Sequence, residues 1–196
     1  VTFSIQAIDN SGMARSKTTE NIDIDITKPD VAVSYDNNDA DSGKYYKANR
    51  TATIKITERN FDPADVNITL KNTDGVIPKL SGWTTTMGTG NKDNTVHTAT
   101  LTYSADGDYT FDISFVDMAG WDNTPVSYSG NNPQEFTIDK TLPVINVAYD
   151  NNAVANGKYF NATRTATVTI TEHNFDPTRV NVTINTARGG VAPSVS

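Results

Sequence analysis

The chain of 196 residues contains no cysteine and only two histidines. Without cysteine it has no disulfide bonds, no thiol catalysis and no cysteine-ligated zinc. It also lacks any apolar run close to the length of about 20 residues that spans a bilayer. We therefore expect no membrane insertion within this sequence.

Clusters of positive charge are missing as well. The 16 lysines and arginines are scattered, and the formal net charge is −7. Binding to a phosphate backbone needs basic residues gathered on one face, so we expect no nucleic-acid partner. Hydrophobic residues make up 36% of the chain and charged residues 20%, a balance typical of a globular protein rather than a disordered one.

The most informative feature of the sequence is an internal repeat. The segment Pro29–Leu70 returns without a gap as Pro143–Ile184, 114 residues later (143 minus 29), and 24 of the 42 aligned residues are identical. A repeat of this length and identity indicates a duplicated structural module within a tandem array. Enzymes seldom contain tandem copies of a catalytic domain, whereas spacers and adhesive stalks often consist of tandem domains.

A second match sets the phase of the repeat. Val1–Asp9 resembles Tyr109–Asp117, and each run is followed by a polar stretch and a closing alternation of apolar and polar residues. We therefore predict the end of one module over residues 1–26, a complete module over residues 27–139, and the start of another over residues 140–196. Both ends of the chain fall inside a module, so we interpret the sequence as a fragment of a longer protein.

Apolar and polar residues alternate in most runs between turn signals, which predicts half-buried β-strands. In the complete module the predicted strands are Val31–Tyr35, Ala52–Thr57, Val66–Leu70, a weaker one near Gly82–Thr85, His97–Tyr103, Tyr109–Val116 and Gln134–Ile138. Helical periodicity is not sustained anywhere. Seven short strands at this spacing predict an all-β fold, an antiparallel two-sheet sandwich with Greek-key connections.

Three motifs in the second half of the module carry a family resemblance. They are Asp106–Phe111, then Asp117–Gly120, then Phe136–Pro143. In this order they resemble the closing half of bacterial immunoglobulin-like (Ig-like) repeats, in which a D-x-A-G-N turn precedes an I-D-x-T-x-P linker. The resemblance implies tandem Ig-like β-sandwiches of about seven strands each. Trp121 departs from the family pattern, which has Asn at that position.

Tyr109 stands two residues before Phe111. This is the spacing of the tyrosine corner and the second cysteine in antibody domains. We expect Phe111 to fill the position of that cysteine by packing alone. The inward residues of this strand are then Tyr109, Phe111, Ile113 and Phe115.

The sequence offers little for catalysis. His97 and His173 are the only imidazole groups, and His173 replaces Arg59 of the other copy, so its position does not require imidazole chemistry. No nucleophile-elbow motif is present. We expect two surface or rim histidines, no catalytic residues and no enzyme activity.

Lys55 is the one candidate for the intramolecular Lys–Asn isopeptide bond that some Gram-positive Ig-like domains contain. Its counterpart in the second copy is Thr169, and strand alternation places Lys55 outward beside the inward residues Ile54 and Ile56. An isopeptide lysine must be buried next to a carboxyl group. We therefore expect Lys55 to be a solvated lysine on the face of a strand.

Calcium is an alternative for the acidic loops, because the resemblance implies arrays that calcium can stiffen at domain junctions. Hard oxygen ligands for calcium are provided in the predicted loops and linkers by Asp9, Asp36, Asp39, Asp41, Asp117, Asp139 and Asp150. We expect no cofactor, and we keep open a junctional site that involves Asp36, Asp117 or Asp150. The structural alternative is hydrogen bonding within Asx turns.

Exposed aromatic residues would indicate sugar binding. Tyr45, Tyr46, Trp83 and Trp121 are the candidates. Adjacent strand residues face opposite sides, so we expect one of Tyr45 and Tyr46 to lie in the core. Coplanar exposed rings at Trp83 and Trp121 would favour a carbohydrate-binding module.

Together these features predict a non-catalytic spacer repeat of a secreted or cell-surface bacterial protein, which extends or presents another domain. The alternative is an adhesin or carbohydrate-binding module, for example one that is accessory to a secreted glycosidase. The expected partners are neighbouring Ig-like modules in the same chain and a host or cell-wall glycan or protein ligand. The incomplete ends lack strands of their own sandwich, so we expect them to pack on each other or on neighbouring chains.

Overall fold

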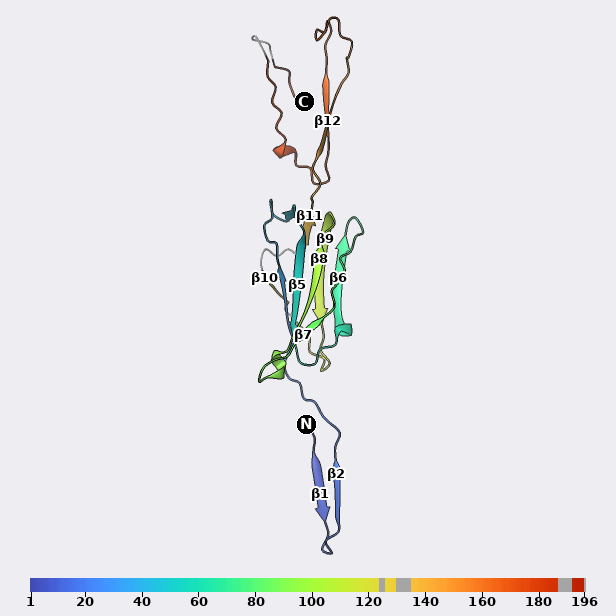
Figure 1. Ribbon diagram of the computed structural model, residues 1–196, viewed down its shortest axis with the longest axis vertical. Helices are drawn as coiled ribbons and strands as arrows, with labels where there is room; N and C mark the ends of the chain where they lie inside the picture. Colours follow the sequence, from blue (N-terminus) through green and yellow to red (C-terminus); the bar gives the residue numbers. More distant parts are fainter. Residues whose placement is uncertain (124–125, 130–134, 187–191, 196) are drawn as a thin grey trace. The chain divides into compact units, whose positions relative to one another are not determined.

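A computed structural model describes residues 1–123, 126–129, 135–186 and 192–195. The central part of the chain forms two sheets that face each other (Figure 1). The first has the strand order β10-β3-β5-β8-β7, and the second has the order β4-β11-β9-β6. The nine strands are β3 (Asp30–Tyr35), β4 (Tyr45–Tyr46), β5 (Arg50–Thr57), β6 (Val66–Asn72), β7 (Thr84–Thr86), β8 (Val96–Tyr103), β9 (Gly107–Phe115), β10 (Ser127–Ser129) and β11 (Glu135–Ile138).

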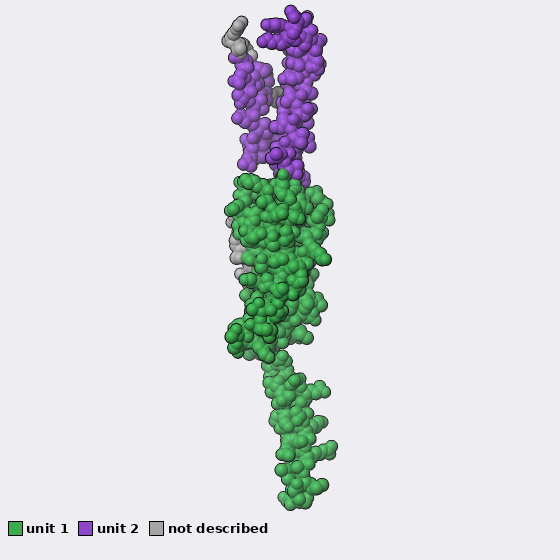
Figure 2. Space-filling model, viewed as in Figure 1, with its two compact units in different colours: residues 1–140 green, residues 141–196 purple. Residues whose placement is uncertain are grey.

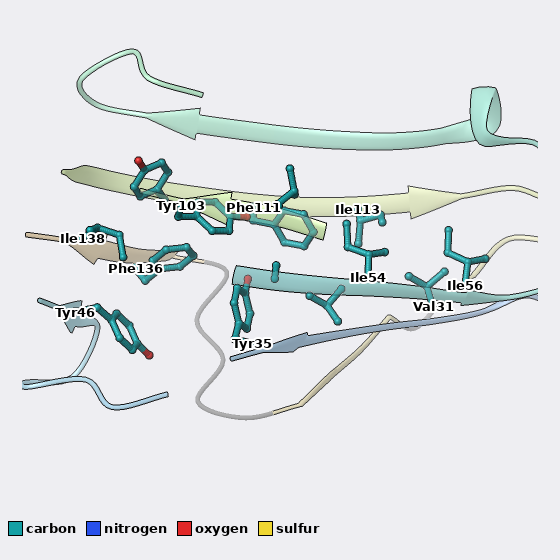
Figure 3. Packing of buried hydrophobic residues seen from close by; sticks show 14 of the residues in the cluster. Val31, Tyr35, Tyr46, Ile54, Ile56, Tyr103, Phe111, Ile113, Phe136 and Ile138 are labelled. Atoms are coloured by element: carbon teal, nitrogen blue, oxygen red, sulfur yellow. The ribbon is translucent and has the colours of Figure 1, made fainter. Parts of the chain in front are cut away.

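Alternation of side chains builds the core between these sheets. In β5 the residues Ala52, Ile54 and Ile56 are fully buried, while the intervening Lys55 is exposed. Figure 3 shows the buried side chains of both sheets meeting in one cluster. The cluster consists of Val31, Val33, Tyr35, Tyr46, Ala52, Ile54, Ile56, Leu101, Tyr103, Tyr109, Phe111, Ile113, Phe115, Phe136 and Ile138. This apolar burial supplies the main driving force for folding.

The all-β prediction is confirmed, and each of the seven predicted strands is present with described ends shifted by at most a few residues. Gln134, the predicted start of the last strand, lies outside the described residues. The inward positions of β9 are also as predicted. Val66, Ile68 and Leu70 point to the core, as expected, but they are only partly buried. The reason is that β6 is an edge strand of its sheet.

Two short strands of the sandwich were not predicted; they consist of two and three residues, and each pairs with a strand distant in the sequence. β4 pairs in parallel with β11, and β10 pairs in parallel with β3. In chain order, β4 lies between β3 and β5 of the other sheet, and β10 lies between β9 and β11 of the other sheet. The chain therefore crosses between the sheets at both places, and the sandwich is not purely antiparallel.

The tyrosine corner is confirmed. The hydroxyl of Tyr109 donates a hydrogen bond to the backbone oxygen of Ala105 at 2.9 Å. Burial raises the pKa of this hydroxyl from its ordinary value. Phe111, two residues on, is fully buried in the core as expected. The contact ties the turn before β9 to the strand that follows it.

A buried arginine closes one end of the core. The guanidinium of Arg50 lies 3.7 Å from the ring centroid of Tyr35, 4.3 Å from that of Tyr46 and 4.7 Å from that of Phe136. Its Nε also donates to the backbone oxygen of Asn37 at 2.8 Å. Burial lowers the pKa of Arg50 from its ordinary value. Such cation–π contacts are strongest where water is excluded.

Each of the flanking segments forms one hairpin. β1 (Ser4–Ile8) pairs with β2 (Ala14–Thr18), and β12 (Val144–Tyr149) pairs with β13 (Ala166–Thr171). Their apolar side chains are exposed. Residues 180–184 repeat Val66–Leu70 in the sequence, yet they are not in a strand. The strand that pairs with β6 is β9, and the sequence holds no counterpart of β9 in the second copy.

Among the described residues, the remaining regular structure consists of three single-turn 3₁₀ helices, η1 (Pro63–Asp65), η2 (Lys92–Asn94) and η3 (Pro177–Arg179). Val1–Lys140 and Thr141–Ser196 form two compact units, coloured separately in Figure 2. The predicted module bounds of 1–26, 27–139 and 140–196 stay a prediction.

None of the helices among the described residues has the length and apolar character needed to cross a membrane.

Candidate functional site

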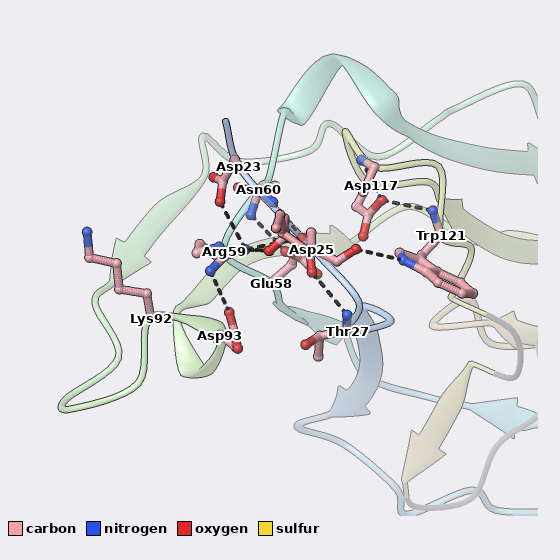
Figure 4. Close-up of polar contacts among 12 residues, drawn as sticks. Asp23, Asp25, Thr27, Glu58, Arg59, Asn60, Lys92, Asp93, Asp117 and Trp121 are labelled. Atoms are coloured by element: carbon pink, nitrogen blue, oxygen red, sulfur yellow. Dashed lines mark hydrogen bonds and ion pairs between the residues drawn. The ribbon is translucent and has the colours of Figure 1, made fainter. Parts of the chain in front are cut away.

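One of the predicted aspartates, Asp117, lies in a buried acidic cluster (Figure 4). The other members are Asp25 and Glu58, and one carboxylate oxygen from each residue lies within 4.8 Å of the others. We call these three residues the acidic triad. They come from three separate segments: the linker between β2 and β3, the end of β5, and the loop after β9.

Asp25 is held in place from both sides. Its Oδ1 accepts a hydrogen bond from the backbone nitrogen of Thr27 at 3.0 Å, and its Oδ2 accepts one from the side-chain amide of Asn60. The side chain is only 4% exposed, and Oδ2 lies 3.9 Å from a guanidinium nitrogen of Arg59. These contacts fix a linker carboxylate against the sandwich.

Glu58 directly follows β5 and is 2% exposed. Its Oε1 accepts a hydrogen bond from the backbone nitrogen of Asn60 at 2.7 Å. Burial raises the pKa of this carboxyl above its ordinary value, and the nearby charges of Asp25 and Asp117 act in the same direction. Negative charge at Glu58 is therefore unfavourable unless a positive partner compensates for it.

Asp117 is 4% exposed and uses its two oxygens differently. Oδ1 accepts hydrogen bonds from the backbone nitrogens of Ala119 and Trp121, both at 2.8 Å. Oδ2 is buried and has no hydrogen-bond partner among the described residues. In Figure 4 this oxygen points away from the backbone of Trp121 and toward the rest of the acidic triad.

Trp121 links the loop after β9 to the linker. Its indole Nε1 donates to the backbone oxygen of Asp25 at 3.3 Å. The ammonium of Lys28 lies 5.7 Å from the centre of the same ring. The residue that departs from the family pattern therefore contacts the linker directly, both as a donor and as an aromatic face.

Arg59 forms an ion pair with Asp25 of the acidic triad, but several carboxylates share it. Besides Asp25, it contacts Asp23 at 3.5 Å and Asp93 at 3.3 Å. It also donates to the backbone oxygen of Ile24 at 3.1 Å. Arg59 therefore fastens the linker to the sandwich, while its single charge cannot balance three buried carboxylates and two further aspartates.

Sequence reasoning selected Asp117 but missed Asp25 and Glu58. Both recur in the second copy of the sequence, where Asp139 and Glu172 stand at the equivalent positions. That recurrence was a usable signal. The spatial meeting of the triad was not predictable from it, since it depends on how three distant segments fold together.

The other predicted aspartates make local contacts. Oδ1 of Asp36 accepts from the backbone of Thr51 at 2.6 Å, and Oδ1 of Asp150 accepts from the backbone of Thr165 at 2.8 Å. Asp9 accepts hydrogen bonds from the backbones of Ser11 and Met13 in its own turn, as the Asx-turn alternative predicts. Asp41 faces Lys47, Asp39 is exposed, and the backbone nitrogen of Asp139 bonds to Tyr46.

The expected surface position is wrong for His97, which is 6% exposed. It is in phase with the inward residues of β8, and both ring nitrogens have partners. Nε2 donates to the backbone oxygen of Glu58 at 2.9 Å, and Nδ1 lies 3.0 Å from the hydroxyl of Thr85. The ring stacks on Phe61 with centroids 4.0 Å apart. His173, in contrast, is exposed as expected.

The aromatic candidates divide between core and surface. Tyr46 is 1% exposed and Tyr45 39% exposed, which confirms the predicted alternation. Trp83 is partly buried and packs edge-on against Phe61 at a centroid distance of 5.0 Å. Trp121 is 39% exposed and is already engaged by Lys28 and the linker.

Comparisons with protein-family models, with curated proteins and with solved structures found no match for this chain. Interpretation of the molecule therefore depends on its repeat, its fold and its contacts. Among the contacts of the described residues, the acidic triad brings titratable groups close enough to act together. Three converging carboxylate oxygens can share a proton or coordinate a metal cation.

Proposed function

We propose that this chain is part of a non-catalytic tandem array of Ig-like β-sandwiches in a secreted or cell-surface protein, and that the array extends or presents another domain. The strand orders support the Ig-like assignment. The run β3-β5-β8-β7 corresponds to the ABED sheet of Ig domains, and β11-β9-β6 corresponds to the GFC sheet.

The observation that carries this proposal is the use of the repeated residues. Arg50 donates to the backbone oxygen of Asn37 at 2.8 Å, and Arg164 donates to that of Asn151 at 2.7 Å. Arg164 also lies over the ring of Tyr149 at 3.6 Å, as Arg50 does over the equivalent Tyr35. The two copies therefore share a contact set, which in the complete module closes one end of the sandwich.

Other repeated residues also serve local structure. Asp62 caps η1 by accepting from the backbone of Ala64 at 2.8 Å, and Asp176 caps η3 by accepting from Thr178 at 2.9 Å. Asp36 accepts from Thr51 in β5, and Asp150 accepts from Thr165 directly before β13. A spacer made of repeated modules requires the residues that both copies share to support folding. Each module must fold, but it need not bind a ligand.

Single-molecule force spectroscopy of the 196-residue chain, held by its two ends, tests the proposal. We expect one dominant unfolding event. It should release on the order of 300 Å of extended chain, which is the gain in length when one sandwich unfolds. Extension without a force peak would contradict a mechanical role. Saturable binding on a glycan array that is lost in Trp121→Ala would support the carbohydrate-binding alternative instead.

A further inference from the structure

The acidic triad carries more negative charge than the described side chains around it neutralise. Asp25, Glu58 and Asp117 are all nearly buried as side chains. Arg59 approaches Asp25 but is shared with Asp23 and Asp93. Several buried carboxylates at close range repel one another and favour any positive partner that can enter.

The unsatisfied oxygen of Asp117 is a second and independent observation. Oδ1 of this residue is fully used by two backbone nitrogens, while Oδ2 is buried without a partner among the described residues. A buried carboxylate oxygen without a donor costs free energy. Its direction toward Asp25 and Glu58 (Figure 4) places the missing partner within the triad.

The spacing of the oxygens matches one cation. Ligands of calcium lie about 2.3–2.6 Å from the ion, so oxygens on opposite sides of it are separated by up to about 5 Å. The triad oxygens lie within 4.8 Å of one another. Magnesium requires regular octahedral geometry, keeps several waters and is usually held by one or two carboxylates, which makes it the poorer match for three protein carboxylates.

We propose that Asp25, Glu58 and Asp117 bind a calcium ion, and that this ion fastens the linker before β3 to the sandwich. Asp25 is the linker's contribution, whereas Glu58 and Asp117 belong to the sandwich. The ion therefore joins two segments that also meet through Arg59, Asn60 and Trp121. Water completes the coordination shell. The inference concerns ion binding alone and does not depend on the proposed spacer function.

Trp121 provides a local reporter, because its indole Nε1 donates to the backbone oxygen of Asp25. The chain has two tryptophans, and Trp83→Phe assigns the two indole N–H resonances. The experiment titrates CaCl₂ into the EDTA-treated 196-residue chain and follows the Trp121 indole resonance by NMR. We expect a saturable shift with a Kd on the order of 10⁻⁴ M. Magnesium should bind more weakly.

Asp117→Asn and Glu58→Gln each remove one ligand charge with little change of shape. We expect each to weaken calcium binding at least about tenfold. Asp39→Asn is the matched control, since it removes the same charge from an exposed loop aspartate outside the triad, and it should bind calcium as the unaltered chain does. Circular dichroism of every variant checks that it is folded.

Three outcomes would overturn the proposal. The first is a Trp121 resonance that does not move at millimolar calcium in the unaltered chain. The second is equal affinity of Asp39→Asn, Asp117→Asn and Glu58→Gln. The third is binding of magnesium but not calcium. The titration of the unaltered chain keeps the proposal testable even if a triad variant fails to fold.

Discussion

At the scale of residues, repeated positions explain more than isolated ones do. Arg50 and Tyr35 recur as Arg164 and Tyr149 and make the same cation–π contact. Single candidates were less reliable, since His97 proved to be buried. Asp117 was predicted without its two triad partners. Local sequence reports strand phase and turn chemistry well, but it does not report which side chains meet across the fold.

Arg50→Met tests the buried arginine. The change removes the guanidinium from three aromatic rings and from the backbone oxygen of Asn37. We expect the free energy of unfolding to fall by about 2–4 kcal/mol, because charged hydrogen bonds and desolvated cation–π contacts are lost together. Urea denaturation followed by tryptophan fluorescence measures the change.

The chain contains its own control for this prediction. Arg164→Met alters the equivalent arginine, which is exposed in its hairpin. It should leave the main unfolding transition, which reports the sandwich, unchanged. If Arg50→Met and Arg164→Met lowered the free energy of unfolding equally, burial of Arg50 would not explain its contribution to stability.

Asp9 gives a prediction for pH. The hydroxyl of Ser11 and the backbone nitrogens of Met13, Ser11 and Gly12 lower the pKa of its carboxyl. A lowered pKa in the folded turn means that Asp9 stabilises the β1–β2 turn above its ordinary pKa. That contribution disappears as the pH falls through the lowered pKa.

Ser11→Ala should raise the pKa of Asp9 toward its ordinary value, since the hydroxyl donor is the largest cause of the shift. An NMR titration of the Asp9 carboxyl carbon measures it. Ser16→Ala, elsewhere in the hairpin, is the control and should not move the titration midpoint. An unchanged midpoint in Ser11→Ala would show that the hydroxyl does not act on Asp9.

At the scale of elements, the sequence pattern was sufficient to find seven of the nine sandwich strands, including β7 of three residues. It did not reveal β4 and β10, which consist of two and three residues and pair with strands distant in the sequence. Residues 180–184 repeat the alternation of β6 but do not form a strand. A strand over residues 180–184 would need a neighbouring strand to pair with. The alternation of a segment does not show whether such a neighbour is present.

Gly107 at the start of β9 gives a prediction at this scale. Its φ is +137°, and a Cβ would come within 2.2 Å of Oδ1 of Asn72. That oxygen accepts from Asp74, and the same amide donates to Val76, so Asn72 cannot yield freely. We expect Gly107→Ala to lower the free energy of unfolding by about 1–3 kcal/mol.

Gly75→Ala is the comparison for this change. Gly75 also has positive φ, at +76°, but the space around its missing Cβ is open. Backbone strain at positive φ should by itself lower the free energy of unfolding of Gly75→Ala by about 1 kcal/mol. Thermal or urea unfolding of both variants separates the two contributions, and a loss no larger in Gly107→Ala than in Gly75→Ala would contradict the predicted clash.

At the scale of the whole molecule, the account depends on one self-contained sandwich, preceded and followed in the sequence by a hairpin that exposes apolar residues. The all-β class and the sandwich could be predicted, because the repeat and the strand pattern agree. The ordering of the incomplete ends could not, since a hairpin without a covering sheet is marginally stable in water. Their apolar side chains have no core to enter in the part of the chain that the structure describes.

Hydrogen exchange of the intact 196-residue chain in dilute solution, resolved by residue, tests this claim most directly. Amides of β5, β8 and β9 should exchange slowest and at one common free energy of opening, because they unfold together with the core. Amides of β1, β2, β12 and β13 should exchange far faster. Fast exchange throughout β5, β8 and β9, or equal protection of the hairpins, would contradict a self-contained central sandwich.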